Sequence, residues 1–144
     1  MKTIHLDSFA EAMSVFNSLD LDAKMKKHSI DVAKIAWKNL GKPNSLSQDD
    51  LLYISTALFH DLYEDTEYRF DSDVNENFLD ALTLLTRDRE NVSYREYIQK
   101  IKDSGNEAAK FVKLCDIEDH LAKSSTLKPS LKERYLKAKK ILEA

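Results

Sequence analysis

Histidine and carboxylate side chains fall at core-facing positions of three expected helices, where apolar side chains would ordinarily lie. Carboxylates at such positions cost free energy unless they are paired or bind a metal ion. The residues placed in this way are, in chain order, His28, His60, Asp61, Glu64, Asp65, Asp116 and His120. Imidazole nitrogens and carboxylate oxygens together suit a borderline or hard divalent ion. The sequence therefore predicts a metal site.

Each of these residues also has a simpler interpretation. A lone histidine on a helix more often packs in the core or faces solvent than binds a metal, and the dipeptide His60-Asp61 is weak evidence on its own. Glu64 and Asp65 fit a solvated face near a helix end, although acidic side chains there oppose the helix dipole. The order of the residues along the chain, taken together, favours a site.

Capping residues predict six or seven helices that position these side chains. Ser8, Asp22, Ser47, Asp73 and Ser93 are expected to begin helices, the last with Glu96 as a capping box. Gly41 and Gly105 are expected to end two of them, and Pro129 to begin the final one. The predicted helices cover residues 9–19, 22–40, 47–65, 75–86, 93–102, 106–122 and 131–143.

The composition supports an all-α fold. The 144 residues include only 2 Gly and 2 Pro, too few for the turns of a β-sandwich or barrel and for a Gly-rich phosphate loop. The length fits one domain over residues 1–144, with a core large enough to hold a site. A chain without a Gly-rich loop can bind phosphate only through a metal ion and side chains.

Charge and cysteine content limit the classes of protein to which this chain can belong. With 22 basic and 25 acidic residues interleaved along the chain, a nucleic-acid partner is not expected. One cysteine allows no internal disulfide and suits a reducing cytosol. No signal peptide and no membrane span are predicted, so we expect a cytoplasmic protein with no membrane contact. The sequence leaves its oligomeric state open, a homo-oligomer included.

Four segments resemble the HD superfamily of metal-dependent phosphohydrolases, and most of all the RelA/SpoT-type hydrolases of the alarmone (p)ppGpp. HSIDVAKIAW resembles the helix H-P-x-x-V-A-x-I of those enzymes, and ALFHDLYEDT resembles A-x-L-H-D-x-x-E-D-T. ALTLLTRD and KFVKLCDIEDHLA resemble V-x-x-L-T and V-K-L-A-D-x-x-x-N-L. The likeness runs over residues 24–142 and implies the HD-domain helical fold around a central metal site, in a compact single-domain form.

The resemblance also implies roles for individual residues. His28, His60, Asp61 and Asp116 match the metal ligands of the family. Mn²⁺ is the expected ion, and the donor set would also accept another divalent transition metal. Glu64 and Asp65 match the catalytic pair that activates and orients the attacking water.

Two departures from the family concern the substrate. His120 replaces an Asn that helps to hold the nucleotide, and it would contact phosphate, add a ligand or fill space. The segment DAKMKKH replaces a Gly-Pro-Tyr-like loop that frames the guanine base. Lys24, Lys26, Lys27 and Arg87 are candidates for binding substrate phosphates, against the alternative of solvated surface charge.

The aromatic pair Tyr94 and Tyr97 has two interpretations. These residues lie one turn apart, and they would either wall the pocket or pack in the core.

The sequence thus predicts a metal-dependent nucleotide phosphohydrolase, resembling guanosine-3′,5′-bis(diphosphate) 3′-pyrophosphohydrolase. One alternative keeps the site and changes the substrate to another nucleotide. The other is a catalytically silent helical binding module. Metal content and the rate of an Asp61→Ala variant separate the enzyme from the silent module.

Overall fold

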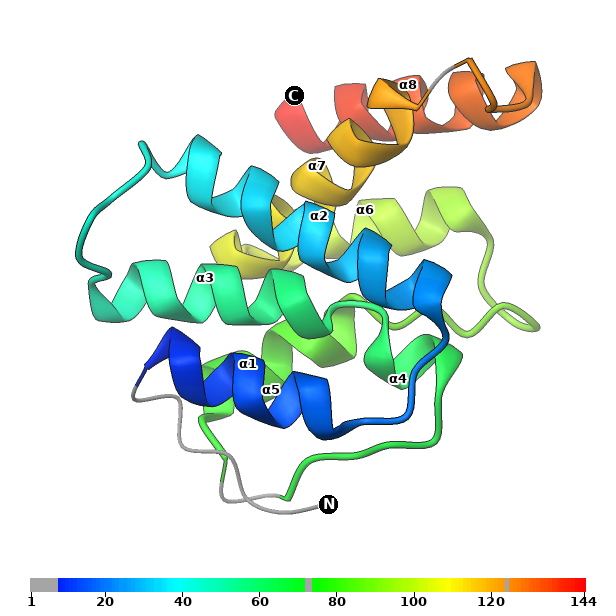
Figure 1. Ribbon diagram of the computed structural model, residues 1–144. Coiled ribbons are helices and arrows are strands. Elements are labelled where there is room, and N and C mark those ends of the chain that lie inside the picture. The colour runs from blue at the N-terminus through cyan, green and yellow to red at the C-terminus, as the bar shows by residue number, and fades with distance from the viewer. Residues whose placement is uncertain (1–7, 72–73, 124) are drawn as a thin grey trace.

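The chain folds as a bundle of helices, as a computed structural model shows (Figure 1). The structure describes residues 8–71, 74–123 and 125–144, and these contain helices and no strand. The all-α prediction is confirmed. The helices are α1 (Phe9–Ser18), α2 (Ala23–Asn39), α3 (Gln48–Phe59), α4 (Leu62–Asp65), α5 (Glu76–Leu84), α6 (Tyr94–Ser104), α7 (Glu107–Ala122) and α8 (Pro129–Glu143).

Local capping explains most of the helix boundaries. The Ser8, Asp22 and Ser93 side chains each accept a hydrogen bond from a backbone N–H in the first turn, and Ser47 forms a full capping box with Asp50. These caps satisfy N–H groups that have no partner within the helix. Their predicted positions are confirmed, but the capping box predicted at Ser93 is not formed, since the Glu96 carboxylate accepts from the Ser93 hydroxyl at 3.1 Å.

The two glycines lie where helices end. Gly41 follows α2 with φ +90° and Gly105 follows α6 with φ +69°, and both therefore adopt the left-handed conformation that favours glycine.

Two predictions about helix boundaries need correction or fall outside the structure. Asn75 caps α5 through its side chain, and Asp73, the predicted cap, lies outside the described residues. The continuous helix predicted over residues 47–65 is wrong, because α3 ends at Phe59 and the short α4 begins at Leu62.

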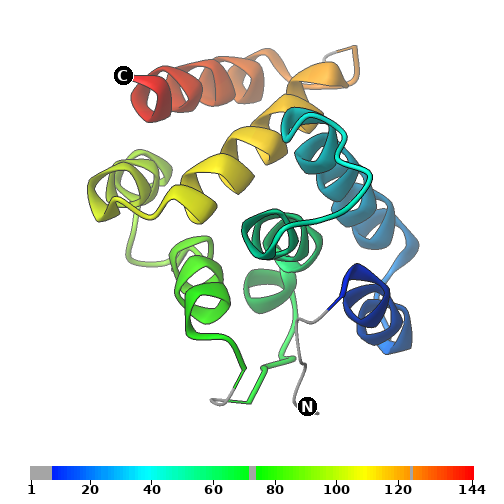
Figure 2. The ribbon, with the colours of Figure 1, turned by 90° about the vertical axis from the view of Figure 1, so that its left-hand side faces the viewer.

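Helix α7 is at the centre of the bundle. It contacts α2, α3, α5, α6 and α8, and the three pairs among α2, α3 and α7 have the most extensive contacts. Both views show α7 (yellow) between the α2–α3 pair (blue to green) and α8 (orange to red) (Figures 1 and 2). The predicted metal ligands lie on α2, on α7 or directly after the last residue of α3.

An aromatic cluster fixes the end of α3. The buried Phe59 ring packs at 5.7 Å from Phe16, 5.1 Å from Phe70 and 5.9 Å from Phe78, each edge to face. Such contacts combine buried apolar area with favourable ring geometry. Since Phe59 directly precedes His60, this cluster holds the backbone from which His60 projects.

Candidate metal centre

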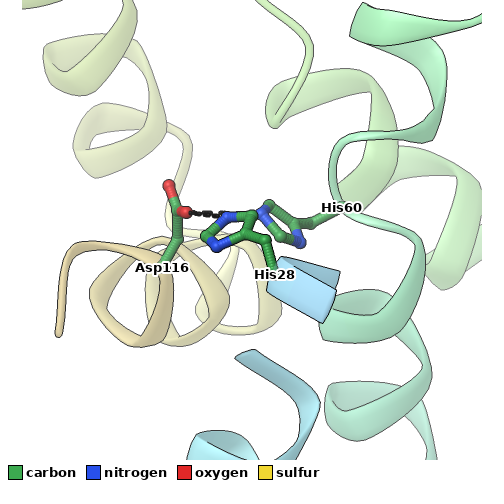
Figure 3. Close-up of side chains that lie close together, drawn as sticks. All are labelled: His28, His60 and Asp116. Carbon is green, nitrogen blue, oxygen red and sulfur yellow. Dashed lines mark hydrogen bonds and ion pairs between the residues drawn. The ribbon is translucent and has the colours of Figure 1, made fainter. Parts of the chain in front are cut away.

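Three helices bring two imidazoles and a carboxylate together inside the bundle. His28 comes from α2, His60 follows the last residue of α3, and Asp116 lies on α7 (Figure 3). One ligand atom from each lies within 4.8 Å of the others. His60 and Asp116 are buried and His28 is partly exposed. These residues form a group that could hold a metal ion.

Asp61 joins this group at the joint between α3, which ends at Phe59, and α4, which begins at Leu62. Consecutive residues on a helix do not face the same way. Here the His60 Nδ1 donates to the Ala57 carbonyl at 2.7 Å, the oxygen that would accept from the Asp61 N–H in a continuous helix. The Asp61 Oδ2 then lies 3.2 Å from the His60 Nε2 and 3.5 Å from the His28 Nε2. All four predicted ligands are therefore neighbours.

Both histidines are oriented by a hydrogen bond at Nδ1. A carbonyl oxygen can only accept, so His60 carries its proton on Nδ1 and a neutral ring leaves a lone pair on Nε2. The His28 Nδ1 lies 2.7 Å from the Asp119 Oδ2, and this contact likewise orients the His28 ring with its Nε2 towards Asp116. Histidines that bind metals are typically held by such outer partners.

The His60 Nε2 tests whether the group fits a metal ion. This atom is buried and makes no hydrogen bond of good geometry, although Asp61 Oδ2 and Asp116 Oδ1 lie 3.2 and 3.4 Å away. Neighbouring ligand atoms held about 2.1 Å from one ion stand roughly 3.0–3.4 Å apart. The four distances between an imidazole nitrogen and a carboxylate oxygen of the group, 2.9–3.5 Å, are close to that requirement. The donor set of nitrogen and oxygen therefore fits a divalent cation.

Asp116 is held by charges on every side. Its Oδ2 accepts from the buried Lys113 ammonium at 2.7 Å, which leaves Oδ1 facing the imidazoles of His28, His60 and His120 at 2.9, 3.4 and 3.2 Å. Burial alone would raise the pKa of the Asp116 carboxyl, but Lys113 and the imidazoles hold it well below its usual range. Lys113 thus keeps the carboxylate ionised and turned towards the group.

The imidazoles respond to the same carboxylates. Burial by itself would lower the pKa of His60, but Asp61 and Asp116 hold it well above its ordinary value. Burial also acts to lower the pKa of His28, but its hydrogen bond to Asp116 and the charges of Asp116 and Asp61 together raise it above the ordinary value.

The four predicted ligands are called the metal group below. Glu64 and Asp65, the predicted catalytic pair, lie beside this group in the wall of a cavity. The Glu64 carboxylate accepts from the Arg87 backbone N–H at 2.7 Å and from the Arg89 guanidinium at 2.6 Å. Asp65 accepts from Arg89 at 3.3 Å. Burial and the carboxylates of Asp61 and Glu64 raise the pKa of Asp65. Asp65 is therefore a better proton acceptor than an ordinary aspartate.

The cavity has a volume of about 400 Å³, within the range of small-molecule sites. Of the predicted substrate residues, Arg87 and His120 line it, as do Tyr94 and Tyr97. Its lining residues are His28, Asp61, Glu64, Asp65, Leu85, Arg87, Arg89, Tyr94, Tyr97, Lys113, Asp116, His120, Arg134 and Tyr135. The metal group and the catalytic pair therefore open into one space.

His120 and the lysines before His28 differ in their placement. The His120 ring stacks on Tyr135 at 4.6 Å with the planes nearly parallel, and its Nε2 contacts Asp116. Lys24 and Lys27 do not line the cavity; both are exposed, and Lys27 pairs with Asp31 at 2.8 Å. The structure thus brings His120, and not these lysines, to the site.

Sequence reasoning missed five residues of the site. They are Arg89, Lys113, Asp119, Arg134 and Tyr135. A signal existed for two: Lys113 and Asp119 lie one turn before and one turn after Asp116 on the same helix, and i,i+3 neighbours share a helix face.

Comparisons with family models, with curated proteins and with solved structures give no match to this chain. None of the described helices has the length and apolar character needed to cross a membrane.

Proposed function

We propose that this chain is a metal-dependent phosphohydrolase that acts on a nucleotide. The observation that carries the proposal is the buried Nε2 of His60, which makes no hydrogen bond of good geometry and faces Asp61 and Asp116 beside a cavity containing arginines and a carboxylate pair. A metal group next to cationic side chains suits an anionic substrate such as a phosphate ester or anhydride.

In this proposal His28, His60, Asp61 and Asp116 hold a divalent ion, with Mn²⁺ the expected one. A bound divalent ion lowers the pKa of a coordinated water and neutralises charge that develops on phosphate. Lys113 and Asp119 keep two of the ligands, Asp116 and His28, in the orientation that binding requires. Tyr135 holds the His120 ring against the same group.

Glu64 and Asp65 supply the proton transfer. A carboxylate has about four lone-pair sites, so the two hydrogen bonds to Glu64 leave sites free for the proton of an attacking water. The raised pKa of Asp65 favours the same role. Arg89 contacts both carboxylates and fixes their positions relative to one another.

By the resemblance, the leading substrate is guanosine 3′,5′-bis(diphosphate), from which water removes the 3′-pyrophosphate. The cavity supplies no Gly-rich backbone cradle, and its side chains would bind the phosphates. The segment before His28 lacks the family's base-framing loop, so a panel of nucleotides with different bases is the proper test.

The test is a screen of nucleotides with Mn²⁺, read out as phosphate against pyrophosphate. We expect His60→Ala and Asp116→Ala to lose both Mn²⁺ binding and turnover. Glu64→Ala should retain Mn²⁺ and lose rate by about 10²–10⁴-fold, the usual contribution of a general base. The matched control is Asp103→Ala, an exposed carboxylate on α6.

Two results would contradict the proposal. One is purified protein that binds no divalent ion while Asp61→Ala leaves every hydrolytic rate unchanged. The other is equal loss of Mn²⁺ in the Glu64, His60 and Asp116 variants, which would contradict the assigned division of roles.

A further inference from the structure

Some of the basic side chains that line the cavity form ion pairs with its acidic side chains and others do not. Four are acidic and four are basic. Arg89 pairs with Glu64 and Asp65, and Lys113 pairs with Asp116. Within residues 8–71, 74–123 and 125–144, the guanidinium groups of the other two, Arg87 and Arg134, form no ion pair with a carboxylate.

One aromatic ring holds both of these guanidinium groups. The Arg134 Cζ lies 4.3 Å from the centroid of Tyr94, and the Arg87 Cζ lies 5.6 Å from it. Arg134 comes from α8, whereas Arg87 comes from the connection between α5 and α6. The face of an aromatic ring attracts a guanidinium electrostatically. Tyr94 therefore contacts two cations that form no ion pair, and both line the cavity.

Tyr94 is itself well supported. Its ring packs against Tyr97 at 5.8 Å and against Tyr135 at 6.1 Å, and the Lys113 ammonium lies 5.4 Å from its centroid. A rigid support of this kind reduces the entropy that a flexible arginine loses when it binds a ligand. The arrangement is thus preorganised for an anion.

We propose that Arg87 and Arg134, positioned by Tyr94, form an anion subsite for a phosphate group other than the one that is attacked. Guanidinium groups match phosphate oxygens bidentately. A divalent ion in the metal group changes the balance of the cavity from four acidic against four basic side chains to an excess of two positive charges. The cavity then attracts a substrate with several negative charges.

The subsite indicates which class of substrate the enzyme takes, and this step rests on the proposed function. A substrate that engages both ends of the cavity carries two phosphate groups, one at the metal group and one between the arginines. Nucleotides with phosphates at two positions, or with a polyphosphate chain, meet this requirement. A nucleoside monophosphate lacks the second group and should be a poor substrate.

The binding test uses inorganic pyrophosphate and metal-free protein in EDTA, followed by calorimetry at low salt. We expect the wild-type protein to bind, and Arg87→Gln and Arg134→Gln each to weaken binding by about tenfold or more, since each removes a charge-assisted contact. Arg95→Gln is the matched control, because Arg95 is exposed next to Tyr94 and outside this cavity. Wild-type affinity in Arg134→Gln, or an equal loss in Arg95→Gln, would overturn the proposal. Binding that these variants leave unchanged identifies the pyrophosphate as an adventitious ion only.

A conservative variant separates the subsite from simple charge and from misfolding. Arg134→Lys keeps the positive charge and loses the planar group that stacks on Tyr94. We expect it to fold as the wild type does by circular dichroism and to bind pyrophosphate several-fold more weakly. Pyrophosphate affinity equal to that of the wild type in this variant means that charge alone is required, and contradicts the stacked subsite.

Two measurements distinguish failure of the subsite from failure of the proposed function. Arg134→Gln should bind Mn²⁺ as the wild type does, whereas Asp61→Asn should lose Mn²⁺ and still bind pyrophosphate. With guanosine 3′,5′-bis(diphosphate) as substrate, Arg134→Gln should raise KM about tenfold or more and change kcat little. A fall in kcat with KM unchanged would instead place Arg134 at the reacting atoms and contradict the subsite.

Discussion

The His28 imidazole and the Asp119 carboxylate are joined by a hydrogen bond of 2.7 Å between Nδ1 and Oδ2, from α2 to α7. Asp119 is buried, and Lys123 also donates to it at 2.8 Å. Lys123 reaches Asp31 on α2 at 3.3 Å. A chain of charged contacts therefore fixes the side of His28 that faces away from the metal group.

Replacing Asp119 should weaken metal binding without unfolding the protein. Asp119→Asn keeps the shape and removes the charge that holds the Nδ1 proton of His28, so we expect about 10–100-fold weaker Mn²⁺ binding by calorimetry. Glu118→Gln is the control, because Glu118 lies on the same helix and pairs outward with Lys38. Equal affinity in the wild type and Asp119→Asn would show that this contact does not orient the ligand.

A bound metal ion should stabilise the fold. The metal group joins α2, α7 and the end of α3, the helices that pack most extensively together. At a free Mn²⁺ concentration of about 100 times Kd, binding adds about 2.7 kcal/mol. This corresponds to a rise in Tm of roughly 6–10 °C for a chain of this length. Calorimetric scans with Mn²⁺ and with EDTA measure the shift, which His60→Ala should abolish.

Lys113 should be important for stability as well as for the orientation of Asp116. The ammonium is buried between the Asp116 carboxylate and the rings of Tyr94 and Tyr97. Lys113→Met leaves a buried carboxylate without its cation, and we expect a loss of about 3–5 kcal/mol in the free energy of unfolding by urea titration. Lys110→Met should change it by less than about 1 kcal/mol, because Lys110 forms no ion pair with a carboxylate in the described part of the chain. A similar small change in Lys113→Met would contradict this account.

The single cysteine should be protected in the native protein. Burial raises the pKa of the Cys115 thiol to about 12, so the reactive thiolate is scarce at pH 8. Iodoacetamide should label Cys115 at least about 100-fold more slowly in the native state than in urea, as followed by mass spectrometry. Rapid native labelling at the rate of the unfolded chain would contradict the burial.

The same shift gives the sign of an alkaline effect on stability. The folded-state pKa lies above the unfolded value of about 8.5, so this contribution is fully present below pH 8.5 and is lost as the pH rises towards 12. Between those limits the loss is about 1.4 kcal/mol per pH unit. Cys115→Ala should make urea midpoints between pH 8 and pH 10 less dependent on pH.

Local signals were enough to predict most of the helices. Ser8, Asp22, Ser47 and Ser93 cap as predicted, because the cap, the first turn and the following apolar positions lie within a few residues of one another. The end of α3 could not be predicted in this way. At this end the His60 Nδ1 donates a hydrogen bond to the Ala57 carbonyl, and no glycine or proline marks the position in the sequence.

The candidate site was only partly predictable for a related reason. His28, His60, Asp61 and Asp116 could be proposed from their order in the chain, and they are neighbours in the structure. Arg134 and Tyr135 reach the cavity only through the packing of α8 on α6 and α7, which no spacing in the sequence reveals. Lys24 and Lys27 were proposed from proximity to His28 along the chain, yet they lie on exposed positions of α2.

The interruption between α3 and α4 has a consequence for how such a site can be built. On an uninterrupted helix, adjacent residues point about 100° apart, so two neighbours in the chain leave the helix in different directions. At the joint between α3 and α4 the His60 Nδ1 donates to the Ala57 carbonyl, and the ends of the two side chains converge, with the His60 Nε2 3.2 Å from the Asp61 Oδ2. A designer who moves this pair into another bundle must therefore transplant the joint between the two helices along with the two residues.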